Sequence, residues 1–177
     1  MALPPLEEIP GSVVTRASEV ELLVLDCDGV LTDGRLWYGA QGEMMKAFDT
    51  RDGHGLVMLR HVGIRFAALS GRPQPLLRQR FEELGFAKVL ERQYLKGEAI
   101  EALCEELDVD RARTAFMGDD VNDLPAMERV GLSACPQDAA AEVIEAAHYV
   151  CGRPGGRGAV RELCELLLKA RGRWPVP

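Results

Sequence analysis

DCDGVLTDG, residues 26–34, follows the apolar run LLVL and places three aspartates and two glycines within nine positions. Alternate residues of an extended segment point to the same side, so Asp26 and Asp28 can share one side while Cys27 points to the other. Neighbouring carboxylates repel each other unless a cation lies among them. The stretch is therefore either a solvated Asp/Gly turn or part of a cation site.

The acidic stretch does not match a calcium-binding EF-hand loop. Such a loop needs a glycine at its sixth position and a carboxylate at its twelfth, and counting from Asp26 those positions are Leu31 and Trp37. A small set of oxygen ligands suits Mg²⁺ instead, because this ion keeps some of its waters and accepts phosphate oxygens of a substrate.

The composition is that of a globular protein with one domain over residues 1–177. The chain has 47% hydrophobic and 28% charged residues and a net charge of −7, which argues against binding to nucleic acid or to an anionic membrane surface. Residues 1–11 are expected to form a loose leader and residues 172–177 a frayed tail.

The chain also lacks the marks of an exported or membrane-spanning protein. No apolar stretch approaches the roughly 20 residues of a membrane span, and the acidic, proline-broken N-terminus is not a signal peptide. The five cysteines are scattered without CxxC spacing, so we expect free thiols in a reducing cytoplasm rather than a disulfide framework or a zinc site.

Short apolar runs alternate with amphipathic segments. Runs of strand character occupy 22–26, 64–70, 87–91, 114–119, 131–135 and 148–150, and helical segments occupy 55–63, 73–85, 97–108, 123–131, 139–147 and 158–172. This alternation predicts an α/β fold, a Rossmann-like parallel sheet with helices on both faces. Residues 35–50, with two short runs around GAQG, break the rhythm and predict a small β-hairpin flap.

Polar side chains follow the ends of several predicted strands, and carboxyl ends of parallel strands meet at one edge of a sheet. They are Asp26 and Asp28 after the first strand, Ser70 after the second, Lys96 after the third, and Asp119 and Asp120 after the fourth. We expect these residues to form one site that contains Mg²⁺. Lys96 taken alone could equally be an ordinary surface lysine.

The four motifs resemble those of the haloacid dehalogenase superfamily. They are Asp26-x-Asp28, Ser70 in LSGR, Lys96 in LKGEA, and GDDVND at 118–123. DGVLTDG, FDTRDGHG at 48–55, GDDVNDLPAME and the late GGRGAVRELCELLL resemble more closely one branch, the 3-deoxy-D-manno-octulosonate 8-phosphate phosphatases. The likeness extends from about residue 20 to residue 171.

The resemblance implies a phosphoric monoester hydrolase that forms an aspartyl-phosphate. Asp26 would be the nucleophile and Asp28 the general acid and base. Mg²⁺ would be bound by Asp26, the backbone carbonyl of Asp28 and Asp119. Ser70, the backbone of Gly71 and Lys96 would bind the phosphoryl oxygens.

Two further carboxylates and three arginines take roles by the same resemblance. Asp120 and Asp123 would orient metal waters and the lysine, although Asp123 could instead cap the helix at 123–131. The substrate carboxylate would bind to the side chains of Arg72 and Arg80, and Arg51 is a further candidate. Each of these could instead pair with a surface glutamate, and His54 receives no catalytic role.

The gaps between the motifs hold no cap domain that would cover the site. The hairpin carries the apolar residues Leu36, Trp37, Tyr38, Met44, Met45 and Phe48. This apolar surface favours burial against another subunit over folding onto its own core, and the resemblance implies a homotetramer. The glycine-rich 152–158 could be a lid with Arg157 at its tip, or an ordinary loop before the last helix.

The predicted function is hydrolysis of 3-deoxy-D-manno-octulosonate 8-phosphate in the synthesis of the lipopolysaccharide inner core of a Gram-negative bacterium. The alternatives are a phosphatase for a nine-carbon sialic-type acid 9-phosphate and, in a different class, a receiver-like domain that accepts a phosphoryl group. A receiver would carry its accepting aspartate on the third strand, after the acid pair. A catalytically silent assembly protein is not indicated, because every motif position keeps a competent side chain.

Overall fold

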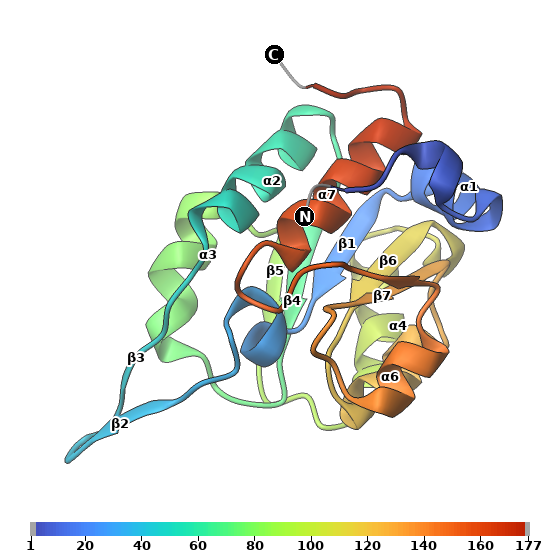
Figure 1. The fold of residues 1–177 in the computed structure, drawn as a ribbon. Helices are drawn as coiled ribbons and strands as arrows, with labels where there is room; N and C mark the ends of the chain where they lie inside the picture. Colours follow the sequence, from blue (N-terminus) through green and yellow to red (C-terminus); the bar gives the residue numbers. More distant parts are fainter. Residues whose placement is uncertain (1–2, 176–177) are drawn as a thin grey trace.

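A six-stranded parallel sheet lies at the centre of the computed structural model, which describes residues 3–175 (Figure 1). The strand order is β5-β4-β1-β6-β7-β8. The strands are β1 (Leu22–Leu25), β4 (Arg65–Leu69), β5 (Lys88–Leu90), β6 (Thr114–Met117), β7 (Leu132–Cys135) and β8 (Tyr149–Val150). Each of them lies within a run that the sequence predicted, and the Rossmann-like α/β fold is confirmed.

The central strands are mostly apolar because they are buried on both faces. Every residue of β1, β6 and β7 is buried. Side chains alternate between the two faces: Leu23 and Leu25 belong to one hydrophobic cluster, and Leu22 and Val24 belong to the other.

Helices cover both faces of the sheet, as the strand–helix alternation predicted (Figure 1). The first cluster is covered by α1 (Gly11–Glu19), α2 (Thr50–His61), α3 (Arg78–Leu84) and α7 (Ala159–Ala170). The second is covered by α4 (Lys96–Glu106), α5 (Leu124–Met127) and α6 (Ala141–Ala146). No helix in residues 3–175 is long and apolar enough to cross a membrane. All five cysteines are free and buried, as expected.

The described part of the N-terminus is not the loose leader that the sequence indicated. Leu3 and Ile9 are buried in the first cluster, and a short 3-10 helix at Leu6–Glu8 lies between them. Helix α1 follows at once and was not predicted. Pro5 and Pro10 do not break this structure, because each stands just before a helix begins, where its fixed φ is tolerated.

The tail was also expected to be frayed, and its described part packs against the body. Trp174 is partly buried against the first cluster, with the Arg161 guanidinium 5.3 Å from its ring centroid. Residues 176–177 of the predicted tail lie outside the described residues. The Trp174 ring buries apolar area among its neighbours, which a purely polar tail would not do.

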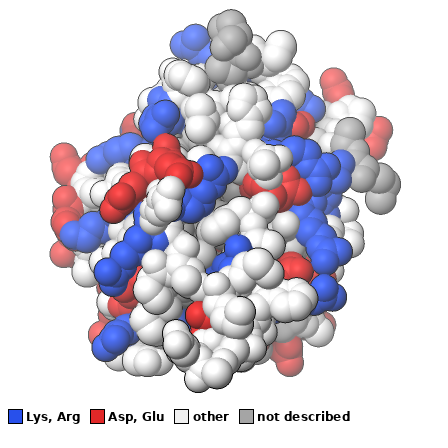
Figure 2. Space-filling model, turned by 90° about the vertical axis from the view of Figure 1, so that its left-hand side faces the viewer, with Lys and Arg blue, Asp and Glu red and all other residues white. Residues whose placement is uncertain are grey.

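The predicted hairpin is present and projects from the body (Figure 1). It consists of β2 (Trp37–Gly39) and β3 (Gly42–Met45), paired antiparallel. Tyr38 and Met44 are 64% and 66% exposed, whereas Phe48 packs against the first cluster. On the face from which the hairpin projects, charges of both signs are intermixed and the lower half is mostly uncharged (Figure 2).

Candidate active site

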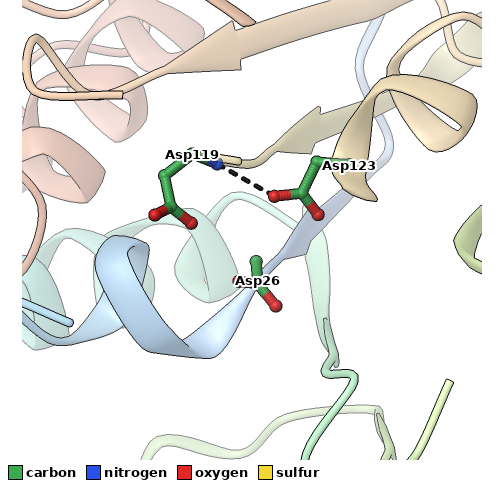
Figure 3. A group of neighbouring side chains, drawn as sticks. All are labelled: Asp26, Asp119 and Asp123. Atoms are coloured by element: carbon green, nitrogen blue, oxygen red, sulfur yellow. Dashed lines mark hydrogen bonds between the residues drawn. The ribbon is translucent and has the colours of Figure 1, made fainter. Parts of the chain in front are cut away.

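The predicted site forms where β1 and β6 end side by side. Asp26 follows β1 directly, and its backbone N–H donates to the carbonyl of Met117, the last residue of β6 (3.0 Å). Asp119 lies two residues beyond β6. One carboxylate oxygen from each of Asp26, Asp119 and Asp123 lies within 4.8 Å of the others (Figure 3).

Gly29 is the residue that lets the two segments approach so closely. Its φ of +90° is a left-handed conformation that favours glycine, and a Cβ at this position would collide with the Asp119 carboxylate. The glycine that follows the acid pair in DCDG therefore has a packing role. It makes room for an acidic side chain that arrives from another part of the chain.

Asp123 is held by backbone donors and by Lys96. Its Oδ2 accepts from the N–H of Asp119 at 3.0 Å, the bond drawn in Figure 3, and from the N–H of Asp120 at 3.2 Å. Its Oδ1 accepts from Lys96 Nζ at 2.5 Å. The Asp123 side chain makes no capping bond to α5, but its bond from the Asp120 N–H is part of the capping box of the short 3-10 helix Val121–Asp123.

Lys96 is not a surface lysine. It begins α4, its side chain is 1% exposed, and Nζ lies 2.9 Å from Asp26 Oδ1 as well as against Asp123. A buried ammonium needs such partners, because leaving it unpaired in a low-dielectric site is costly. The lysine thus links the segment after β1 to the segment after β6.

The carboxylates carry more negative charge than Lys96 offsets. Burial raises the pKa of Asp26 to about 6, with Lys96 opposing the shift and Asp123 adding to it. Burial together with Asp26 and Asp123 raises the pKa of Asp119 to about 8. The pKa of Lys96 is raised because the attraction of Asp26 and Asp123 outweighs its burial. Hard oxygen donors with excess negative charge match the ligand preference of a divalent cation such as Mg²⁺.

Asp28 does not direct its carboxylate as the simple alternation of a strand would. The chain leaves the extended conformation after Asp26 and turns through Cys27–Leu31. The Asp28 carboxylate accepts from Lys46 Nζ at Oδ1 and from Gln74 Nε2 at Oδ2 (2.8 Å). Its own partners therefore differ from those of Asp26.

Lys46 and Gln74 are site residues that lie outside the four sequence motifs. The Lys46 side chain is 2% exposed, and its Nζ also lies 3.3 Å from Glu43 Oε1 of the hairpin. Gln74 is completely buried. A lysine in an otherwise apolar flap (MMKAF) and a glutamine between two prolines (RPQP) were the available signals.

Ser70 and Arg72 lie at the same edge of the sheet. Ser70 follows β4 and is buried, and its Oγ accepts from the N–H of Arg72 (3.2 Å) and from Gln74 Nε2 (2.9 Å). The Arg72 guanidinium lies 3.6 Å from Asp28 Oδ2 and 3.2 Å from Glu43 Oε2. Gly71, between them, has only the Gln93 carbonyl within 4 Å of its would-be Cβ, so this stretch of backbone is open.

The other predicted site residues have partners other than Asp26, Asp119 and Asp123. Arg51 pairs with Asp49, Arg80 with Glu83, and Arg157 with Asp33. Asp120 is exposed, and its side chain accepts from the N–H of Val121. His54 is exposed on α2.

The glycine-rich segment 152–158 packs tightly against the turn after β1. The Gly156 N–H donates to the Val30 carbonyl (2.8 Å), and a Cβ at Gly155 would collide with the Gly29 carbonyl. Gly156 has a φ of +60°. Gly155 and Gly156 are thus explained by the close approach of their backbone to the turn after β1. This explanation does not require a lid.

Asp52, also missed, connects this segment to α2. Its carboxylate accepts from the N–H of Gly158 (3.2 Å) and of Arg161 (2.7 Å) at the start of α7. Burial raises the pKa of Asp52 to about 6, opposed by those two backbone donors.

Three comparisons with known proteins agree with this geometry. A sequence profile described as haloacid dehalogenase-like hydrolase matches residues 82–162. The 3-deoxy-D-manno-octulosonate 8-phosphate phosphatase of Salmonella typhi is 43% identical over 161 residues, which are 91% of this chain and 86% of that protein.

Solved structures give the same result. The phosphatase of that name from Yersinia pestis has a TM-score of 0.89 at 41% identity, and the match covers 92% of this chain and 88% of that one. The enzyme from Moraxella catarrhalis, in complex with a magnesium ion, a phosphate ion and a KDO molecule, has a TM-score of 0.90 at 33% identity, with 93% and 94% covered.

The sheet, the acidic edge and the buried lysine define a hydrolase of the haloacid dehalogenase-like class. Within that class, the chain belongs to the family of 3-deoxy-D-manno-octulosonate 8-phosphate phosphatases.

Proposed function

We propose that this protein is a Mg²⁺-dependent phosphatase that hydrolyses 3-deoxy-D-manno-octulosonate 8-phosphate to the free sugar acid and inorganic phosphate. The observation that carries the proposal is the group of Asp26, Asp119 and Asp123, in which the buried Lys96 bridges Asp26 and Asp123. It occurs in a chain of which 91% aligns, at 43% identity, with a phosphatase for this substrate.

Asp26, Asp119 and the backbone carbonyl of Asp28 are the proposed metal ligands. Their oxygens are hard donors, and two of these side chains have pKa values raised by burial and by carboxylate neighbours, a repulsion that a divalent cation relieves. When bound, Mg²⁺ neutralises phosphate charge so that an anionic nucleophile can approach an anionic ester.

The chemistry uses Asp26 and Asp28 in turn. An Asp26 carboxylate oxygen attacks phosphorus, the bond from phosphorus to the sugar oxygen breaks, and an aspartyl-phosphate forms. Asp28 gives its proton to the departing alkoxide. It then takes a proton from the water that attacks phosphorus, and phosphate and the free Asp26 carboxylate result.

The remaining motif residues stabilise and orient the phosphoryl group. The Ser70 hydroxyl and the Gly71 backbone N–H donate to its oxygens, and Lys96 adds a fixed positive charge. Asp123 holds Lys96 in place through the 2.5 Å contact, and Asp120 orients a metal-bound water.

Arginine side chains are the proposed ligands of the substrate carboxylate. Arg72 is the best placed in this chain, since its guanidinium lies 3.6 Å from Asp28. Arg51, Arg80 and Arg157 are further candidates, and each has an exchangeable acidic partner. We also propose that the exposed hairpin joins four copies into a homotetramer and that the enzyme works in the cytoplasm, in lipopolysaccharide synthesis.

The test is phosphate release from a panel of sugar phosphates, with and without EDTA. We expect the eight-carbon sugar-acid 8-phosphate to have the highest kcat/KM and EDTA to abolish turnover. Preference for a nine-carbon sialic-type acid 9-phosphate would change the assigned substrate. A long-lived phospho-aspartate without turnover would identify a receiver-like function instead.

A further inference from the structure

Gln74 occupies an unusual position for an amide side chain. It lies just before the short 3-10 helix Pro75–Leu77, is completely buried, and reaches two of the motif residues at once. Its Nε2 is 2.8 Å from Asp28 Oδ2 and 2.9 Å from Ser70 Oγ, and its Oε1 is 2.7 Å from Lys46 Nζ.

The chemistry of the neighbours determines which way the amide points. The Lys46 ammonium can only donate, so the atom facing it must be the carbonyl oxygen of Gln74. Both N–H groups of the amide therefore point to the other side, one to Asp28 and one to Ser70. A backbone bond from Gln74 N–H to Glu91 Oε1 (2.8 Å) fixes the base of the side chain.

Hydrogen-bond accounting at Ser70 shows what this contact achieves. A serine hydroxyl has two acceptor sites and one proton. The Arg72 N–H (3.2 Å) and Gln74 Nε2 (2.9 Å) fill the acceptor sites. The hydroxyl proton is then the group left to donate, to the neighbouring Cys27 sulfur in the substrate-free protein and to a phosphoryl oxygen when substrate is bound.

A similar restraint acts on Asp28. Lys46 donates to one of its oxygens and Gln74 to the other, so its carboxylate plane is fixed from two sides. The lysine comes from just after β3 and the glutamine from the segment after β4. Gln74 accepts from the donor Lys46 and donates to the acceptors Asp28 and Ser70. Both polar atoms of its side chain are therefore paired.

We propose that Gln74 is a positioning residue that orients the Ser70 hydroxyl toward the phosphoryl group and fixes the Asp28 carboxylate for proton transfer. The proposal rests on the phosphatase function proposed above, and it assigns to Gln74 no contact with the substrate. Through Gln74, the phosphate-binding serine and the acid–base residue are held by a single amide.

The decisive variant is Gln74→Met, which keeps the length of the side chain and removes its donors and acceptor. We expect kcat on the sugar phosphate to fall about 10- to 100-fold, in the range of losses for misplaced acid–base and oxyanion groups. Mg²⁺ affinity should stay unchanged. The matched control is Gln79→Met on α3, where an exposed amide binds Glu83, and it should keep wild-type kcat.

Two measurements separate positioning from a general structural effect. With p-nitrophenyl phosphate, whose leaving group needs no proton, the loss in Gln74→Met should be several-fold smaller than with the sugar phosphate. In a Ser70→Ala background, the Gln74→Met loss should also shrink several-fold, because the two changes act on one hydrogen bond.

Equal losses with both substrates, together with full additivity in the Ser70→Ala background, would overturn the proposal, as would wild-type kcat in Gln74→Met. If Gln74→Met does not fold, Gln74→Glu serves for the same comparisons, since it keeps the shape and the acceptor but loses both donors. Failure of the wild-type protein to release phosphate from either ester would instead refute the proposed function.

Discussion

Lys96 and Asp123 show how strongly single residues define this site. Both side chains are almost fully buried, and they are joined by a 2.5 Å contact. The position of each in the motif order was evident from the sequence, and the structure brings both to Asp26. The partners of Asp28 could not be predicted from the sequence. Lys46 and Gln74 meet there only because the hairpin and the segment after β4 fold together.

Asp26→Asn tests the nucleophile. The amide keeps the size of the side chain and an oxygen that can still accept from Lys96, so we expect a wild-type melting temperature. Turnover should fall by about 10⁴-fold or more, because an amide oxygen cannot form the phospho-enzyme. Steady-state phosphate release and thermal melting measure the two effects, and unaltered activity would refute the assigned role.

The acidic group also predicts how Mg²⁺ binding depends on pH. In the metal-free protein the pKa of Asp119 is about 8 and that of Asp26 about 6, both raised. A metal binds to the ionised carboxylates and displaces their protons, so binding weakens as the pH falls. Titration calorimetry should show the apparent Kd rising about tenfold per pH unit between pH 8 and pH 6, with proton release. A Kd independent of pH would contradict the proposed ligands.

Among the elements, the strands were predictable and some helices were not. The strands lie in short, mostly apolar runs, and their short length favours strands over helices. Helix α1 has the sequence GSVVTRASE, which has weak helix propensity, and it is stabilised by the burial of Val13 and Ala17 against the core. Propensity alone could not reveal it.

The start of helix α2 could not be predicted from helix propensity either. It begins at Thr50, five residues before the predicted segment, even though Gly53 and Gly55 disfavour a helix. Both glycines lie close to neighbours: a Cβ at Gly55 would press on Cys164 of α7, and one at Gly53 would displace the end of the Arg80 side chain. A sequence pattern does not show a neighbour that is distant along the chain.

A substitution of Asp52 tests how much the contact between α2 and α7 contributes to stability. Its two oxygens accept from the N–H of Gly158 and Arg161, so it ties α2 to the beginning of α7. Asp52→Asn replaces one acceptor with a donor that faces a backbone N–H, and we expect a loss of roughly 1–3 kcal/mol in the free energy of unfolding. Urea denaturation measures it. The matched control is Asp49→Asn, a partly exposed residue of the same helix start, which should cost less.

For the whole molecule, the exposed hairpin is the feature that one chain does not explain. Tyr38 and Met44 are apolar and more than half exposed on a two-stranded flap, which is marginally stable alone. If the hairpin joins subunits, Tyr38→Glu with Met44→Glu should give monomers with a native circular dichroism spectrum and lower activity. Sedimentation measures the mass.

The control for the hairpin variant is Val150→Glu, which places the same charge on an exposed apolar position outside the flap. It should leave the assembly intact. A wild-type protein that sediments as a monomer would contradict the proposed tetramer. So would a double variant that keeps the wild-type mass.

The docking of Gly155 and Gly156 onto the turn after β1 has a consequence for synthesis of the protein. All of the motif aspartates, the serine and the lysine have been synthesised once residue 123 is made, but the backbone that supports the turn after β1 follows about thirty residues later. A nascent or truncated chain ending after β8 would carry all of the motif side chains. It would still lack the segment with Gly155 and Gly156, which packs against the turn after β1. We therefore expect the site to be fully arranged only after Gly155 and Gly156 have been added to the chain.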